Sequence, residues 1–106
     1  NEIRMYHPLA MRDENEDAIP GYVISPMGYL NIASTIYGDT YCLDTNTLNA
    51  DGEPVVVLVS HEEISEDSTP DEVKESIVKI ADSFKEFIEK YNNEELASDY
   101  YDVKRK

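Results

Sequence analysis

Residues 54–60 of this chain read PVVVLVS, and this stretch decides the fold. Successive side chains of a strand point to opposite faces of the sheet, and here aliphatic, mostly β-branched residues fill both sets of positions. A strand that is apolar on both faces is typical of the buried interior of a sheet. We therefore expect residues 54–60 to form the most buried, central strand.

Four further stretches before this strand also have the composition of strands. Residues 2–6 (EIRMY) and 40–44 (TYCLD) alternate polar and apolar side chains. Residues 22–24 (YVI) and 29–36 (YLNIASTI) are short apolar stretches bounded by proline or glycine. Residues 45–54 (TNTLNADGEP) have the composition of a turn. The sequence thus predicts several short strands of one sheet. A tight turn then leads from the strand at residues 40–44 into the strand at residues 54–60.

After residue 61 the hydrophobic period becomes that of a helix. Thr69 is a typical N-cap, Pro70 suits the first helical position, and acidic residues follow in the first turn. Apolar residues then recur at spacings of four and three, at Val73, Ile77, Ile80, Phe84, Phe87 and Tyr91. We expect one continuous helix that ends near residues 92–93 and packs this stripe, with Phe84 and Phe87, against the sheet. A coiled coil is the alternative use of the stripe.

These patterns predict an α+β fold in which a mixed, mostly antiparallel sheet is packed by a C-terminal amphipathic helix. The chain has 106 residues, the length of one domain. We place the folded core in residues 1–92 and a tail in residues 93–106, which Tyr100, Tyr101 and Val103 can attach to the core.

The charge of the chain is concentrated in one segment. With 23 acidic and 9 basic residues the formal net charge is −14. Fourteen of the acids lie between residues 13 and 73, where there is no lysine or arginine: Asp13, Glu14, Glu16, Asp17, Asp39, Asp44, Asp51, Glu53, Glu62, Glu63, Glu66, Asp67, Asp71 and Glu72. Such a field repels nucleic acid and anionic membranes and speeds association with a basic partner. The alternative is that the acids only keep the chain soluble.

Two exposed acidic clusters are the candidate partner-binding residues. The first is Asp13, Glu14, Glu16 and Asp17, and the second is Glu62, Glu63, Glu66 and Asp67. We expect them to contribute to one negative surface that faces a basic protein.

The residues that carry nucleophilic or metal chemistry are few: Cys42, His7 and His61. Cys42 lies between Asp39 and Asp44, and a negative neighbourhood raises the pKa of a thiol, so we interpret it as a buried, inert side chain. His61 is interpreted as a strand-end residue, since no second histidine follows at the spacing of a zinc-protease helix. We predict no catalytic residue, no cofactor and no metal site.

No stretch is long and apolar enough to cross a bilayer, because the longest apolar run is residues 55–59. A single cysteine excludes an internal disulfide and a cysteine-based zinc finger. We therefore expect a reduced, cytoplasmic protein.

Four segments, residues 29–34, 38–44, 54–62 and 80–88, occur in an order and spacing that resemble the SMI1/KNR4 family of the SUKH superfamily. The resemblance implies an α+β domain with a mixed sheet. It also implies membership in a group rich in bacterial immunity proteins that bind and neutralise toxins, alongside fungal cell-wall regulators. Members usually open with a helical segment, whereas this chain begins at a predicted strand, so we expect its N-terminal helices to be missing.

Three functions follow as hypotheses. The first is an immunity protein whose acidic surface binds a basic, nuclease-like toxin domain. The alternative is a non-enzymatic regulatory or scaffold module that binds a protein, again without nucleic acid or membrane. The third, a small hydrolase, has only Cys42 and the two histidines in its favour, so we expect no enzyme.

Overall fold

The computed structural model describes residues 3–5, 21–96 and 100–104, and its centre is a five-stranded sheet. The strands are β1 (Ile3–Met5), β2 (Tyr29–Thr35), β3 (Thr40–Leu48), β4 (Pro54–Val59) and β5 (Val78–Ala81). They follow chain order across the sheet, and each neighbouring pair is antiparallel. The expected α+β class is confirmed, and the sheet, expected to be mostly antiparallel, has only antiparallel pairings in these residues.

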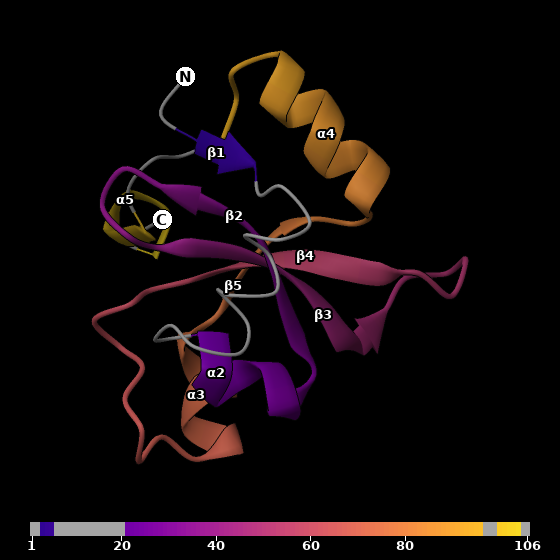
Figure 1. Ribbon diagram of the computed structural model, residues 1–106. Helices are drawn as coiled ribbons and strands as arrows, with labels where there is room; N and C mark the ends of the chain where they lie inside the picture. Colours follow the sequence, from indigo (N-terminus) through magenta and orange to yellow (C-terminus); the bar gives the residue numbers. More distant parts are fainter. Residues whose placement is uncertain (1–2, 6–20, 97–99, 105–106) are drawn as a thin grey trace.

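Helices cover both faces of the sheet (Figure 1). The helical elements are α2 (Gly21–Ile24), the 3-10 turn η1 (Ser25–Met27), α3 (Pro70–Ser76), α4 (Phe84–Asn92) and α5 (Tyr100–Lys104). Buried side chains of α2 and α3 belong to one hydrophobic cluster, and those of α4 and α5 belong to another. The sheet therefore separates two cores.

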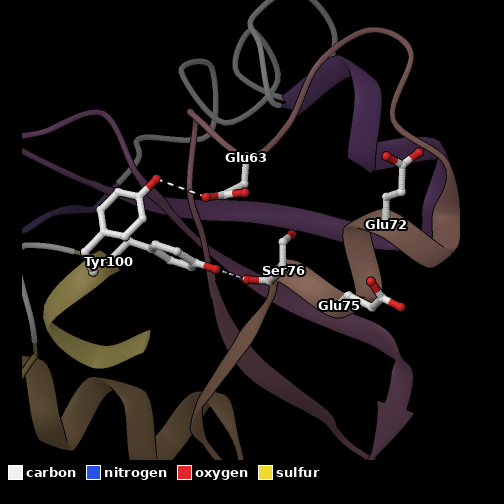
Figure 2. A pocket seen from close by; sticks show the side chains of 6 residues that line it. Glu63, Glu72, Glu75, Ser76 and Tyr100 are labelled. Carbon is white, nitrogen blue, oxygen red and sulfur yellow. Dashed lines mark hydrogen bonds between the residues drawn. The ribbon is translucent and has the colours of Figure 1, made fainter. Parts of the chain in front are cut away.

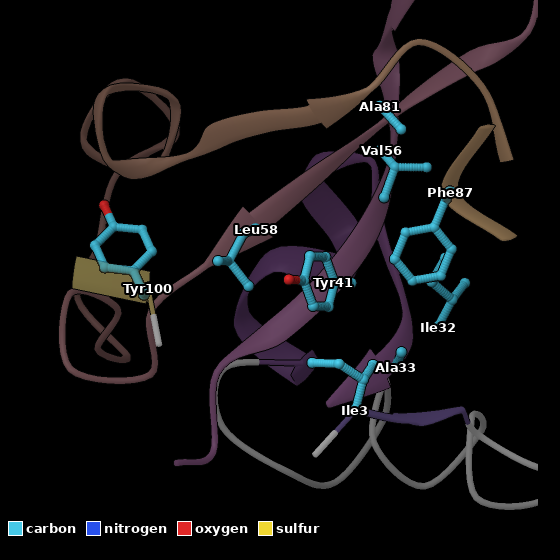
Figure 3. Close-up of a cluster of buried hydrophobic side chains, with 9 residues drawn as sticks. All are labelled: Ile3, Ile32, Ala33, Tyr41, Val56, Leu58, Ala81, Phe87 and Tyr100. Carbon is cyan, nitrogen blue, oxygen red and sulfur yellow. The ribbon is translucent and has the colours of Figure 1, made fainter. Parts of the chain in front are cut away.

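Strand β4 contributes to both cores because its side chains alternate between them. Val56 and Leu58 lie in the cluster that includes Phe87 of α4 and Tyr100 of α5, as Figure 3 shows. Val55, Val57 and Val59 lie in the cluster of α2 and α3. Every residue from 55 to 60 is buried, which confirms the predicted burial of this strand. It pairs with β3 on one side and β5 on the other, so it is an interior strand, but the predicted central position is wrong, because β3 is the middle strand of the described sheet.

The single long helix predicted after Pro70 is wrong. Helix α3 ends at Ser76, β5 follows as residues 78–81, and a separate helix, α4, begins at Phe84. Strand β5 pairs with β4, whose outer edge would otherwise bury backbone N–H and C=O groups without partners. The regular 4-3-4 spacing of apolar residues therefore runs across a helix, a strand and a second helix.

This break also changes the positions of the two phenylalanines. Phe87 is fully buried, as predicted, and its ring lies 5.2 Å from that of Tyr41 between centroids. Phe84 keeps 44% of its surface exposed, so its predicted place in the core is wrong. It lies at the first position of α4, where Ser83 caps the helix by accepting a hydrogen bond from the Glu86 amide at 3.1 Å.

Residues 22–24 were predicted as a strand, but the structure has them in α2, followed by η1. A run of three apolar residues has no period that separates the two states. Val23 and Ile24 are both buried, and Pro26 suits the following 3-10 turn because it needs no backbone donor there. Gly28 ends the turn at a φ of 98°, where a Cβ atom would lie 2.8 Å from Thr45 Oγ1.

The connection between β3 and β4 is shorter than the turn predicted at residues 45–54. Strand β3 continues to Leu48, with an irregular register after Asp44. The remaining turn is held by Asn49, whose Oδ1 accepts hydrogen bonds from the backbone amides of Asp51 at 2.9 Å and Glu53 at 3.0 Å.

Candidate functional site

The second predicted acidic cluster lies on the connector between β4 and α3, residues 60–69. All four of its members, Glu62, Glu63, Glu66 and Asp67, are exposed. The first cluster, Asp13, Glu14, Glu16 and Asp17, lies outside the described residues. The structure therefore locates half of the candidate partner-binding residues, and the side chains of these four are exposed.

One member of this cluster lines a groove of about 340 Å³, which we call the acidic groove. It is lined by Glu63 of the connector, Glu72, Glu75 and Ser76 of α3, and Tyr100 and Tyr101 of α5. Figure 2 shows Glu63 between Tyr100 on one side and the carboxylates of Glu72 and Glu75 on the other. The groove thus brings residues 63 and 101 together with α3.

Two tyrosines fix the C-terminal wall of the acidic groove. The hydroxyl of Tyr101 donates to Glu63 Oε1 at 3.0 Å, and Glu62 Oε2 lies 3.4 Å from the same hydroxyl. The hydroxyl of Tyr100 donates to the backbone carbonyl oxygen of Ser76. Burial, and then the charge of Glu63, raises the pKa of Tyr100, which keeps this phenol protonated. The wall is therefore a neutral hydrogen-bonding surface beside charged carboxylates.

Helix α3 begins at an N-terminal cap, as the sequence predicts. Thr69 Oγ1 accepts from the Glu72 amide at 3.2 Å, and Glu72 Oε1 accepts from the Thr69 amide at 3.1 Å. Hydrogen bonds to the Glu72 carboxylate from the backbone amide and then from the side chain of Thr69 lower the pKa of Glu72, which therefore stays ionised at the groove. The cap positions a carboxylate as well as a helix.

A buried carboxylate, Asp39, joins three separate segments behind the acidic groove. Asp39 Oδ1 lies 2.9 Å from His61 Nδ1 and accepts from the His61 backbone amide at 3.2 Å. Asp39 Oδ2 accepts from the backbone amide of Tyr100 at 3.2 Å. Asp39 is only 2% exposed, so this joint is internal. His61 lies two residues after Val59, the last residue of β4, close to the strand end expected for it.

The sequence alone does not predict this joint. The only local signal is Gly38, which has a φ of 88° and precedes a carboxylate at the start of β3. The partners of Asp39 are 22 and 61 residues away in the sequence, so no short motif contains them.

A smaller hollow of about 230 Å³ adjoins the acidic groove through Tyr101. Its other lining residues are Tyr37, Asp39, His61 and Glu62. Tyr37 is 57% exposed, and its neighbour Ile36 is 59% exposed, in the turn between β2 and β3. This face therefore combines carboxylates with an exposed apolar pair.

Cys42 lies far from this chemistry, in the interior of the sheet. It is fully buried, and its Sγ donates to Asn31 Oδ1 at 2.8 Å. Burial raises the pKa of the Cys42 thiol, as expected for an unreactive side chain.

In the described part of the chain, no group of three or more histidine, cysteine, aspartate or glutamate side chains is arranged to hold a metal ion. Within the same residues, none of the helices has the length and hydropathy of a membrane span.

Comparison with known proteins gives one result for the family. The sequence model of the SMI1 / KNR4 family (SUKH-1) matches residues 1–90. This range contains all four segments on which the resemblance rests. Comparisons with curated proteins and with solved structures give no match.

Proposed function

The chain belongs to the SMI1/KNR4 family (SUKH-1), and from this premise we propose that it is an immunity protein of a bacterial toxin system. Its partner is a basic, nuclease-like toxin domain, which it binds through an acidic surface in the cytoplasm. The proposed role is binding without catalysis and needs no cofactor, metal, nucleic acid or membrane.

One observation carries the proposal, namely the excess of exposed acid around the acidic groove. The connector and α3 hold seven carboxylates and one lysine between residues 62 and 75: Glu62, Glu63, Glu66, Asp67, Asp71, Glu72, Glu75 and Lys74. All of these side chains are exposed. Carboxylates at this density repel one another, and a folded domain needs far less charge to stay soluble. A basic partner relieves the repulsion.

The apolar pair Ile36 and Tyr37 supports a protein rather than a small basic ligand as the partner. Protein interfaces combine a central apolar contact with a polar or charged rim, and exposed tyrosines are frequent anchors. Tyr37 shares its hollow with Glu62 and Tyr101, so an apolar contact adjoins the acidic residues. A partner that covers this face meets both kinds of surface.

The test is the kinetics of association with the toxin domain that this proposal expects to be encoded beside the gene. The variant carries Glu62→Gln, Glu63→Gln, Glu66→Gln and Asp67→Asn, which removes four charges with little change of shape. At low salt we expect its association rate to fall about tenfold, and at high salt we expect the two rates to converge, because rim charges act mainly on encounter.

A matched control carries the same loss of charge on another part of the surface, at Asp51, Glu53, Glu89 and Glu95, which are all exposed. Its association rate should stay within about twofold of the parent, since distant exposed charges are largely screened. Equal effects of both variants would mean that only net charge matters and would contradict a defined acidic interface. The same exchange at Asp13, Glu14, Glu16 and Asp17 tests the first cluster.

A protection assay separates the immunity proposal from its alternative. Cells that produce the toxin domain should survive only when this protein is present, and the four-charge variant should protect less at low expression. A protein that gives no protection, but binds another partner, is instead a regulatory or scaffold module of the family.

A further inference from the structure

A third hollow, of about 270 Å³, lies on the opposite side of α3 from the acidic groove. Met27, Tyr29 and Ile77 form apolar walls, and Asp44, Asp71 and Lys74 supply its charges. We call it the Asp44 pocket. Since α3 contributes to both hollows, one partner that covers this helix can reach the two of them.

Asp44 is the unusual group of this pocket, because it is a carboxylate that is only 2% exposed. Its Oδ1 accepts a hydrogen bond from the Asn46 amide at 3.0 Å, and this is the one hydrogen bond that the described residues give to the carboxylate. No fully buried side-chain nitrogen or oxygen in the described residues lacks a partner, so Oδ2, which accepts no hydrogen bond from them, keeps some contact with solvent, and Asp44 lines the pocket.

No cation of the described residues neutralises Asp44. Their ion pairs involve Asp39, Glu62, Asp82 and Glu86, and none includes Asp44 or Lys74. A buried carboxylate with one hydrogen bond and no paired cation has lost much of its solvation without full compensation. A cation that enters the pocket supplies the missing charge-assisted hydrogen bonds.

The walls select the shape of that cation. Met27 and Ile77 suit an aliphatic stem, and Tyr29, although only 4% exposed, contributes aromatic surface to the lining of the pocket. Burial, and then the charge of Asp44, raises the pKa of Tyr29, so the phenol stays neutral. A volume of about 270 Å³ lies just below the range of pockets for drug-sized ligands and suits a single long side chain.

We propose that the Asp44 pocket binds one lysine or arginine side chain of the protein partner, with the charged head at Asp44 and the stem between Met27 and Ile77. This inference rests on the proposed function for its choice of a protein as the source of the cation. Lys74 lies at the same pocket and repels the incoming charge, so it limits the affinity.

The pocket itself is tested without any toxin, by NMR titration of the full chain with N-acetyl-arginine amide and N-acetyl-lysine amide. The neutral analogue N-acetyl-citrulline amide is the matched ligand control. We expect amide shifts at Met27, Asn46 and Lys74, and binding of the arginine compound at least about tenfold tighter than that of the citrulline compound. Shifts centred on Glu63 and Glu75, or equal binding of citrulline, would overturn the proposal.

Three variants test whether each charged side chain strengthens or weakens binding of the arginine compound. Asp44→Asn keeps the acceptor for the Asn46 amide, and we expect it to weaken binding of the arginine compound about tenfold or more. Asp51→Asn removes the same charge at an exposed turn and should change the Kd less than twofold. Lys74→Gln should strengthen binding two- to threefold. Weaker binding by this variant would mean that the pocket prefers an anionic or zwitterionic ligand, and it would contradict the proposal. If Asp44→Asn fails to fold, the citrulline comparison and Lys74→Gln decide.

Binding experiments with the toxin domain distinguish this inference from the proposed function. If Asp44→Asn lowers the affinity for the adjacent toxin domain at least tenfold, mainly through faster dissociation, the pocket holds a partner side chain. If the toxin domain binds Asp44→Asn as it binds the parent, the inference is wrong while the proposed function stands. If the arginine compound binds but the parent protects against no toxin, the proposed function fails and the cation pocket remains.

Discussion

The rings of Phe84 and Phe87 stack with their centroids 6.2 Å apart, but α4 turns them toward different surroundings. Phe87 lies fully inside the cluster with Tyr41, and Phe84 is 44% exposed at the start of the helix. Both residues fit the same apolar stripe in the sequence. At the scale of the residue, burial depends on where the helix begins, which the stripe alone does not give.

Truncation of the two rings should therefore have unequal effects. We expect Phe87→Ala to lower the free energy of unfolding by about 3–5 kcal/mol, because it leaves a cavity beside Tyr41. Phe84→Ala should cost less than about 1.5 kcal/mol, since much of its ring already contacts solvent. Urea denaturation measures both values, and equal losses would contradict the boundary between β5 and α4.

Cys42 gives a prediction about stability at high pH. Burial raises the pKa of its thiol in the folded chain, so above about pH 8.5 the unfolded chain loses this proton first. The contribution of Cys42 to stability is complete below that pH and falls as the pH rises, by about 1 kcal/mol near pH 9.5. The stability of Cys42→Ala should not decline in this way until the tyrosines titrate at about pH 10. Parallel curves for the two proteins would mean that the thiol is not protected.

At the scale of the element, the segment from α3 to α4 shows how one apolar pattern serves two states. Val78 and Ile80 occupy partly buried positions of β5, whereas Val73 and Phe87 are buried from helices on opposite faces of the sheet. Each short helix has its own cap, Thr69 for α3 and Ser83 for α4. The two caps show where the two helices begin, whereas the spacing of the apolar residues does not predict either start.

Removing the first cap should loosen α3 and the acidic groove together. We expect Thr69→Ala to lower the free energy of unfolding by about 1 kcal/mol, and Ser83→Ala to have a similar effect through α4. Only Thr69→Ala should move the pKa of Glu72 part of the way back up toward that of an ordinary glutamate, since it removes the side-chain hydrogen bond of Thr69 and keeps that of the backbone amide. NMR titration of the Glu72 side chain distinguishes the two variants, and an unchanged pKa in Thr69→Ala would show that the Thr69 side chain does not lower the pKa of Glu72 in solution.

At the scale of the whole molecule, α5 closes one end of the core. Tyr100 is 1% exposed in the same cluster as Val56 and Phe87, and its backbone amide donates to Asp39. Tyr101 and Val103 pack against that cluster, as the sequence suggested for this segment. The C-terminal helix thus supports the turn before β3 and one wall of the acidic groove.

Removal of residues 97–106 should consequently destabilise the entire domain. We expect a loss of about 3–5 kcal/mol in the free energy of unfolding, the range for deletion of a large buried aromatic side chain. Tyr100→Phe keeps the ring and loses only the hydrogen bond to the Ser76 carbonyl, so it should cost about 1 kcal/mol. A truncated chain as stable as the parent would show that α5 is not part of the folding unit.

The sequence by itself determined the features that depend on neighbours along the chain. The apolar run at residues 54–60 required a strand buried on both faces, and Thr69-Pro70 required a helix start. The anionic surroundings and mid-strand position of Cys42 indicated an inert thiol. The family resemblance also followed from the order of four local segments, and the match over residues 1–90 confirms it.

Only the tertiary structure decided the features that depend on distant partners. The pairing of β5 with β4 converts residues 78–81 from a predicted helix into a strand, because the edge of β4 needs hydrogen-bond partners. Asp39 meets His61 and Tyr100 across 22 and 61 residues, and Asp44 shares its pocket with Asp71 and Lys74 of α3. Local patterns set which states a segment can adopt, and the unsatisfied groups of the rest of the fold select among them.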